Sequence, residues 1–295
     1  MGYDLLISIF VRCIYLFVFF YSANAYTVTD IDIEKLKDYL AKEEVYYKDG
    51  LYVGHLVDTS VKYPVSLISE LENERSIFVA HVFNQKQFWV AKIDKHSVKN
   101  VIYQMALFDG LFGIKLTHAQ LRFQLAVPAT LYRVKNNKLV VTATSDLVFT
   151  VQAATPIGNN YNIFDAVAGN YVVVSRLVNT YDRVVGEEIP DGDIIRQYQL
   201  VNLSLSDKYM LLLNGIRMSN ENLAKETYYA TTANCINILM DIIDYTLDLS
   251  YPRLVLTFEN TLLNGRSPNE KLILEALRAR NLIRDDSRLE DYIQN

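Results

Sequence analysis

Hydrophobic and polar positions alternate through the middle of the chain, and this pattern predicts strands. Between residues 76 and 154 the apolar runs are rich in β-branched and aromatic residues, and residues 117–127 (THAQLRFQLAV) alternate strictly. Residues 130–144 indicate a hairpin with Asn136-Asn137 at its turn, because asparagine tolerates positive φ. Further strands are expected at 171–178 and 194–204. The sequence therefore predicts an antiparallel sheet.

The spacing of apolar positions changes to the helical period on both sides of this region. Helices are expected over residues 33–43, 64–71 and 208–218, from Asn234 onward, and after a capping box at 267–270. Ser206 is the candidate cap for the helix over 208–218. The polar segment from Asp182 to Asp193 is expected to be a loop. We therefore predict an α+β fold in which helices pack on an antiparallel sheet.

A short apolar run near the N-terminus is typical of a secretion signal. Residues 13–21 (CIYLFVFFY) are too few to span a bilayer comfortably, and Ser22-Ala23-Asn24-Ala25 follows them as an A-x-A cleavage pattern. We therefore expect residues 1–25 to be a signal peptide and the protein to be exported, periplasmic or envelope-associated. The n-region contains Asp4 and has Arg12 as its only cation, so an uncleaved N-terminal anchor stays open as the alternative.

Charge and cysteine content narrow the classes of partner and of chemistry. A net charge of −5 argues against nucleic acid or an anionic membrane surface as a partner drawn in by electrostatics, so any membrane contact would have to be apolar. The chain has no serine-hydrolase elbow, no glycine-rich phosphate loop and no metal-ligand spacing, and we expect no cofactor and no metal. The pairs Glu187-Glu188 and Asp191/Asp193 fit a solvated loop better than a glycosidase site.

Cys235 is the one cysteine that remains if the signal is removed, and it lies where a reactive thiol would lie. With Asn234 as the helix cap, Cys235 becomes the first helical residue, and Ile236, Leu239 and Ile243 supply an apolar stripe. Free backbone N–H groups and the helix dipole would then lower the pKa of the thiol, and the same groups could hold an oxyanion. The alternative is a small buried cysteine without chemistry.

A nucleophilic thiol needs a base, and His118 is the candidate. The strict alternation places His118, Gln120, Arg122 and Gln124 on one face of a strand, and apolar residues on the other. This polar face could line a cleft, with His118 as general base and Gln120 or Gln124 orienting its imidazole. The alternative is a half-exposed strand with a solvated face. The remaining histidines are interpreted as structural or surface residues: His55, His81 and His96.

Three stretches together resemble a known family. They are THAQLRF at 117–123, RQYQLVNLSLSDKYMLLL at 196–213 and TYYATTANCINILMDIID at 227–244, and they look like the Lnb N-terminal periplasmic domain family of bacterial envelope proteins. The resemblance covers residues 100 to 250, and more weakly the segment SPNEKLILEALRARNLI near the C-terminus. It implies a permuted papain-like thiol fold of the NlpC type over 101–295, with 26–100 as an accessory N-terminal region.

By the same resemblance, Cys235 would be the nucleophile and His118 its base, with Asn234, Gln120, Arg122 and Gln124 as possible support. The implied function is an acyl transfer like that of lipoprotein N-acyltransferases, with a phospholipid or lipoprotein acyl group as substrate and a membrane surface as a possible partner. A peptidoglycan peptidase or amidase with the same dyad, and a non-enzymatic envelope binding module, stay open. Apolar flanks at Phe108, Leu111 and Phe112 would favour the lipid substrate.

Overall fold

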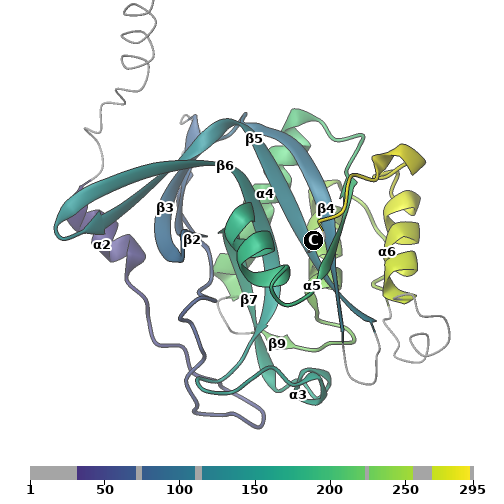
Figure 1. Cartoon of the computed structure of the whole chain (residues 1–295), viewed down its shortest axis with the longest axis horizontal. Coiled ribbons are helices and arrows are strands. Elements are labelled where there is room, and N and C mark those ends of the chain that lie inside the picture. Colours follow the sequence, from purple (N-terminus) through teal and green to yellow (C-terminus); the bar gives the residue numbers. More distant parts are fainter. Residues whose placement is uncertain (1–31, 71–74, 110–114, 223–225, 255–267, 293–295) are drawn as a thin grey trace, which may run out of the picture.

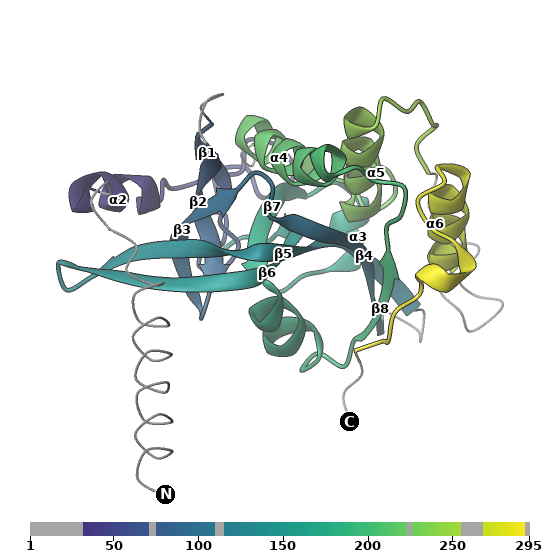
Figure 2. The same cartoon turned by 90° about the horizontal axis from the view of Figure 1, so that it is seen from above.

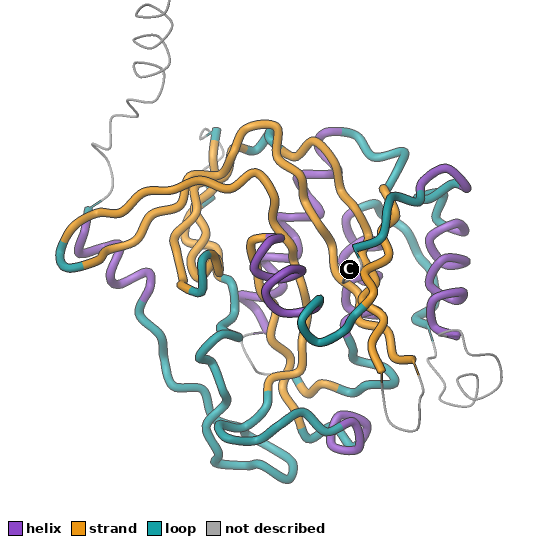
Figure 3. Tube along the Cα trace, in the orientation of Figure 1, coloured by secondary structure: helices purple, strands orange, loops and turns teal. Residues whose placement is uncertain are grey.

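The computed structural model describes residues 32–70, 75–109, 115–222, 226–254 and 268–292 (Figure 1). The helices are α2 (Ile33–Leu40), α3 (Ile163–Val167), α4 (Leu205–Asn222), α5 (Cys235–Thr246), α6 (Pro268–Ala279), the π-helix η2 (Tyr181–Glu188) and the 3-10 turn η4 (Asp285–Ser287). The strands are β1 (Ser66–Ser69), β2 (Ser76–Asn84), β3 (Gln87–Asp94), β4 (Val98–Asp109), β5 (Lys115–Lys135), β6 (Lys138–Ala154), β7 (Tyr171–Asn179), β8 (Ile194–Gln199) and β9 (Thr227–Tyr228). This confirms the predicted α+β class (Figure 3).

All nine strands of the described residues belong to one sheet. Its main path is β1-β2-β3-β5-β6-β7-β9, and β4 pairs with β5 and carries β8 on its other side. The pairings are antiparallel apart from a single parallel contact of β2 with β7, at Phe83 and Val178. The antiparallel sheet predicted from the alternation is therefore confirmed.

The long β5–β6 hairpin serves two parts of this sheet. Its turn is at Asn136 and Asn137, which have φ of 51° and 56°, so the predicted asparagine turn is confirmed. The register shifts between Gln124 and Ala129, and there the hairpin changes neighbours. Before this irregularity β5 pairs with β4, and after it β5 pairs with β3. A bulge-like irregularity bends a strand and increases its twist, which separates the two parts.

Helices cover both faces of the sheet. Figure 2 shows α4 and α5 along one face and the π-helix η2 on the other. The face under α4 and α5 is apolar, with Leu121, Phe123 and Phe149 in the main core. The same core includes Val65 and Ile93 from the N-terminal part of the chain and Ile283 near its end. The main core therefore includes residues on both sides of the boundary expected at residue 100, which lies inside β4. Smaller clusters form around Leu36, Tyr47 and Ala106.

Three local predictions need correction. The helix expected over 64–71 is not formed in residues 64–70, the part that the structure describes. Ser66–Ser69 is strand β1, because Leu67 pairs with Val79 and the Asn220 side chain bonds the Leu67 backbone N–H. Helix α4 begins at Leu205, and its cap is Ser204, whose Oγ accepts from the Asp207 N–H while the Asp207 carboxylate accepts from the Ser204 N–H. The expected loop from Asp182 contains the π-helix η2.

Two predictions fall wholly or partly outside the described residues. The signal peptide or anchor at 1–25 lies there, and so does Ser267 of the capping box, although α6 begins at Pro268 as the proline at the first helical position predicts. Among the described helices, none is both long enough and apolar enough to cross a bilayer.

Candidate functional site

The start of α5 has the geometry that the sequence predicts. Asn234 is in the extended region, with φ of −122° and ψ of 177°, and its Oδ1 accepts hydrogen bonds of 3.0 Å from the N–H groups of both Ile236 and Asn237. Its Nδ2 donates to the Ala230 carbonyl at 2.8 Å, which ties the cap to the preceding turn. Asn234 is therefore a fully bonded N-cap, and Cys235 is the first helical residue.

Cys235 is a free thiol with only 3% of its surface exposed. Burial raises its pKa, while hydrogen bonds to the sulfur from the Ala119 N–H, the Tyr228 hydroxyl and the Ile236 N–H lower it. The N–H groups at the helix start therefore lower the pKa of this thiol as expected, but burial is the larger effect and the pKa is raised overall. The hydrogen-bond donors that act on the sulfur come from Ala119, Tyr228 and Ile236.

Three tyrosines lie close enough to the Cys235 sulfur for its charge to act on them. Burial raises the pKa of Tyr103, Tyr161 and Tyr228, and a charge on Cys235 raises each further. All three therefore stay protonated at neutral pH and can donate a hydrogen bond, but they cannot serve as a base. The Tyr103 hydroxyl is buried and has no hydrogen-bond partner among the described residues.

His118 lies on the face of β5 opposite to Cys235. Its register partner on β4 is Ala106, which packs with Val184 of η2. Ala119, the next residue on β5, belongs to the apolar core with Cys235 and donates to its sulfur. Because successive side chains on a strand point to opposite faces, the imidazole and the thiol are separated by the sheet. The structure therefore does not bring the two expected dyad residues together.

The His118 imidazole is instead held among cations. Its Nε2 lies 2.7 Å from the Thr150 Oγ1. Burial lowers the pKa of His118 well below its ordinary value, and the charges of Arg183, Lys62 and Arg176 lower it further. The imidazole is therefore neutral near pH 7.

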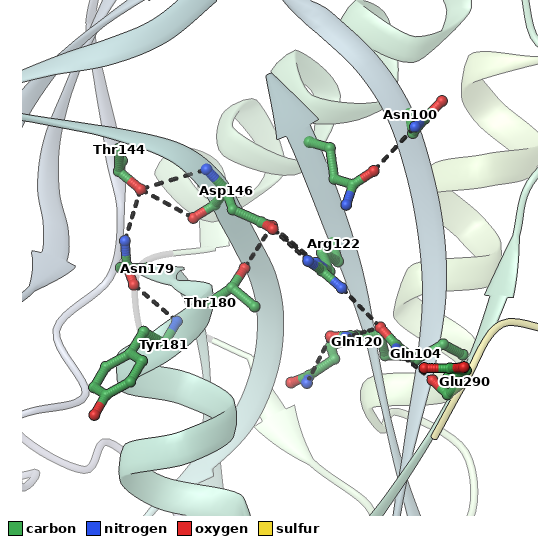
Figure 4. A network of polar contacts seen from close by, with 12 residues as sticks. Asn100, Gln104, Gln120, Arg122, Thr144, Asp146, Asn179, Thr180, Tyr181 and Glu290 are labelled. Carbon is green, nitrogen blue, oxygen red and sulfur yellow. Dashed lines mark hydrogen bonds and ion pairs between the residues drawn. The ribbon is translucent and has the colours of Figure 1, made fainter. Parts of the chain in front are cut away.

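The other polar residues of this strand face form a network among themselves (Figure 4). Gln120 donates to Gln104 Oε1 at 3.1 Å. It also donates to Glu188 Oε2 at 3.0 Å. Arg122 forms an ion pair with Asp146 and donates from Nη1 to Gln197 Oε1 at 2.9 Å. Gln124 Oε1 accepts from Asn100 Nδ2 at 2.9 Å. The side-chain hydrogen bonds of Gln120 and Gln124 thus go to groups other than the His118 imidazole that they were expected to orient.

The π-helix η2 completes this network with buried charges. Arg183 reaches Glu187 at 2.7 Å and Glu188 at 2.8 Å, and its Nε donates to Gln120 Oε1 at 2.9 Å. Arg176 of β7 pairs with Glu187 at 2.9 Å. Burial raises the pKa of Glu188 to about 7, although Arg183 lowers it. The interpretation of Glu187-Glu188 as part of a solvated loop is therefore wrong.

The sequence contains two signals for this second cluster. Arg176 stands alone in the apolar strand YVVVSRLV, and a buried arginine requires a carboxylate partner. Arg183 and Glu187 have the i, i+4 spacing of a helical ion pair. Together these two features indicate a covered strand face rather than an exposed loop.

The remaining expected residues are placed as follows. His81 is buried with φ of 62°, burial lowers its pKa to about 4, and Ser66 Oγ lies 3.4 Å from its Nδ1. Phe108 is half-buried on β4, whereas Leu111 and Phe112 lie outside the described residues. In the described ranges, no three His, Cys, Asp or Glu side chains are grouped to hold a metal ion.

Comparison with known proteins identifies no relative of this chain. No family model matches the chain. No curated protein and no solved structure matches it either.

Proposed function

We propose that this protein is an exported, thiol-dependent acyl-transfer enzyme with Cys235 as its nucleophile. The observation that carries the proposal is the position of Cys235, a free thiol at the first residue of α5 directly behind the Asn234 cap. There the N–H groups of Ile236 and Ala119 and the Tyr228 hydroxyl favour the thiolate and lower its pKa. These groups stabilise a thiolate, and they are of the kind that holds the oxyanion of a tetrahedral intermediate. An inert buried thiol needs no such donors, because it packs as a small hydrophobe.

The balance of effects on the thiol suggests how it would become reactive. Burial is the main cause that raises the pKa of Cys235, and the donors act against it. A substrate or water that reaches the sulfur reduces the desolvation but leaves the donors in place. The pKa of the thiol then falls, and the thiolate forms only when the site is opened.

The chemical step follows from the nucleophile. The thiolate attacks the carbonyl carbon of a lipid ester, the S–C bond forms as the ester C–O bond breaks, and the leaving alkoxide takes up a proton from solvent. An amine then attacks the thioester carbon, loses its proton to solvent, and displaces the Cys235 thiolate. The N–H groups of Ala119 and Ile236 would stabilise the oxyanion in both steps.

His118 has no proton-transfer role in this mechanism, because its imidazole lies on the other face of β5. Its contact with Thr150 supports a positioning role instead. The bond fixes β5 next to β6, and β5 carries the Ala119 N–H that reaches the sulfur. The thiol lies at the start of a helix that packs on a strand preceding it in the sequence. This arrangement is consistent with the resemblance to the Lnb N-terminal periplasmic domain family and with the permuted papain-like fold that the resemblance implies.

A second candidate is a non-enzymatic envelope binding module. The burial of Cys235, its raised pKa and the separation from His118 favour it. A peptidoglycan peptidase or amidase would use the same nucleophile but would release the acyl group to water rather than to an amine.

Acylation of Cys235 by an ester tests the proposal. The Cys13→Ser chain, in which Cys235 is the only thiol, is incubated with p-nitrophenyl octanoate, and the peptide that contains Cys235 is weighed by mass spectrometry. We expect one octanoyl group, which hydroxylamine removes and which an added amine removes faster than water does. Faster release to water than to the amine would favour the hydrolase.

Two variants give the controls. Cys235→Ala removes the site, and Tyr228→Phe removes one donor while keeping the ring, so it should slow acylation without unfolding the protein. A native chain that is never acylated, and whose thiol reacts with an alkylating reagent only after denaturation, would establish the binding module.

A further inference from the structure

Exposed apolar side chains from separate segments gather at one end of the molecule. Phe164 of α3 is 66% exposed, Leu51 is 65% exposed and Ile157 is 61% exposed. Tyr161 and Tyr229 are also exposed and lie in the same region. We call these five residues the apolar end. Figure 1 shows α3, the loop before it and the loop around residue 50 together at the lower edge of the view.

Direct contacts hold these segments together. The Leu51 N–H donates to Asn170 Oδ1 at 3.3 Å, beyond the C-terminal end of α3. The Ile157 N–H donates to the Leu56 carbonyl at 3.0 Å. The Tyr229 ring lies over Gly169, so closely that an added Cβ would be 2.2 Å from a ring atom. The apolar end is therefore one surface rather than a set of unrelated loop tips.

This surface has little net charge. In residues 51–54 and 156–168 the only Asp, Glu, Lys, Arg or His is Asp165. Its carboxylate turns inward, where it accepts from the Tyr52 hydroxyl at 2.9 Å and from Asn170 Nδ2 at 3.2 Å. The exposed Lys48 and Asp49, which border the apolar end beside Gly169 and Asn170, carry opposite charges. A surface that presents apolar tips, tyrosine rings and little net charge matches the boundary between uncharged headgroups and acyl chains of a bilayer.

The apolar end adjoins the thiol. The Ala230 N–H donates to the Ala166 carbonyl of α3 at 3.0 Å, and the Ala230 carbonyl accepts from the Asn234 side chain that caps α5. Tyr161, which is part of the apolar end, lies close enough to Cys235 for the charge of the thiolate to act on it. The hydrogen bonds of Ala230 thus connect the apolar end to the start of α5, where Cys235 lies.

We propose that the apolar end docks on a bilayer of zwitterionic phospholipid, with Leu51, Ile157 and Phe164 inserted at the headgroup boundary. This orientation turns the start of α5 toward the membrane. The docking itself does not require catalysis; only the further consequence, that Cys235 receives its acyl group directly from the bilayer, rests on the proposed function.

Hydrogen exchange of the full chain tests the docking, because it reports each segment separately even if the N-terminus is itself anchored. Exchange is followed by mass spectrometry with and without phosphatidylcholine vesicles. We expect amides in 50–56 and 156–168 to exchange more slowly on vesicles, and those of the 127–144 hairpin to be unchanged. The double variant Leu51→Ser/Phe164→Ser should lose this slowing, whereas Tyr245→Ser, which removes an exposed ring at the far end of α5, should keep it.

The possible outcomes separate the two proposals. Slower amide exchange on vesicles without acylation of Cys235 would support docking and reject the enzyme. Acylation of Cys235 without slower exchange would support the enzyme and reject docking. Slowing that depends on protein concentration and needs no vesicles would mean that a second copy of the chain covers the apolar end, and it would overturn docking on lipid. Equal slowing in the parent and in the double variant would overturn it as well.

Discussion

The two faces of strand β5 show two ways of building a protein interior from one stretch of sequence. Ala119, Leu121 and Phe123 pack under α4 and α5 in the apolar core. Between them, Gln120 and Arg122 face η2 and are also buried. The first face is stabilised by removal of apolar surface from water, and the second is viable only because its polar groups are paired. The comparison teaches that a polar strand face need not be solvated.

The two faces respond differently to damage. An apolar core that loses a side chain loses its packing, and the surroundings relax in part. A buried ion pair that loses one partner leaves an uncompensated charge in a place that water does not reach. Glu188, with 2% of its surface exposed, is such a charge when Arg183 is removed. The polar face should therefore be the more sensitive of the two to single substitutions.

The largest effect is expected for Arg183→Met, which keeps the volume and removes the cation shared by Glu187 and Glu188. We expect a loss of about 3–5 kcal/mol in the free energy of unfolding, because the buried Glu188 loses its cation and Glu187 keeps only Arg176. Equilibrium unfolding in urea measures it. Adding Glu187→Gln and Glu188→Gln to the same chain should recover most of the loss.

The matched control is Arg253→Met, which breaks a 2.6 Å ion pair with Asp241 on the surface. Exposed pairs are worth little, so its effect should stay below about 1 kcal/mol. Equal losses for Arg183→Met and Arg253→Met would mean that water reaches the η2 face.

The second largest effect is expected on the pH dependence of the free energy of unfolding. Glu188 and His118 on the polar face contribute to it in opposite directions. The pKa of Glu188 is raised from 4.5 to about 7, so the folded state holds this proton more tightly and stability falls as pH rises from about 4.5 to about 7. The pKa of His118 is lowered, so the unfolded state binds this proton more tightly and stability falls as pH drops below 6.5. Glu188→Gln should remove the first loss, at most about 3 kcal/mol, and His118→Asn the second.

Unfolding midpoints in urea between pH 4.5 and pH 8 measure both slopes. The two variants are each other's control, because each should flatten a different limb of the profile. A Glu188→Gln profile parallel to that of the parent would show that Glu188 is already ionised in the folded protein, paired with Arg183.

Much of the sheet could be predicted from local pattern. The strict alternation of 117–127 and the asparagine turn at 136–137 depend on neighbours along the chain, and both predictions are confirmed. The Asn234 cap could be predicted for the same reason, because a cap bonds groups only two and three residues away.

The features that the sequence pattern did not predict depend on contacts between residues far apart in the chain. The alternation shows that His118 and Ala119 face opposite ways, but only the position of α5 decides which face receives Cys235. The burial of Glu188 depends on Arg183 and on Gln120, which lies 68 residues earlier. Likewise, Ser66–Ser69 becomes a strand because β2 and Asn220 bond its backbone. The dyad prediction therefore needed tertiary information that spacing does not contain.

The smallest effect is expected on the apolar face, at the closest approach of α4 to the sheet. A Cβ added at Gly215 would lie 3.2 to 3.3 Å from the Phe149 ring, which is fully buried and has little room to move. Gly215→Ala gains about 0.5–1 kcal/mol from helix propensity, but overpacking costs about 1–3 kcal/mol, so the net change in unfolding free energy is a loss of about 1 kcal/mol. In a Phe149→Leu chain the ring contact is gone, and the same Gly215→Ala change should become stabilising. A double-mutant cycle measured in urea decides between the two effects, since propensity alone would give the same sign in both chains. If the sign does not reverse, the ring can shift, and the apolar face is the more adaptable of the two surfaces of β5.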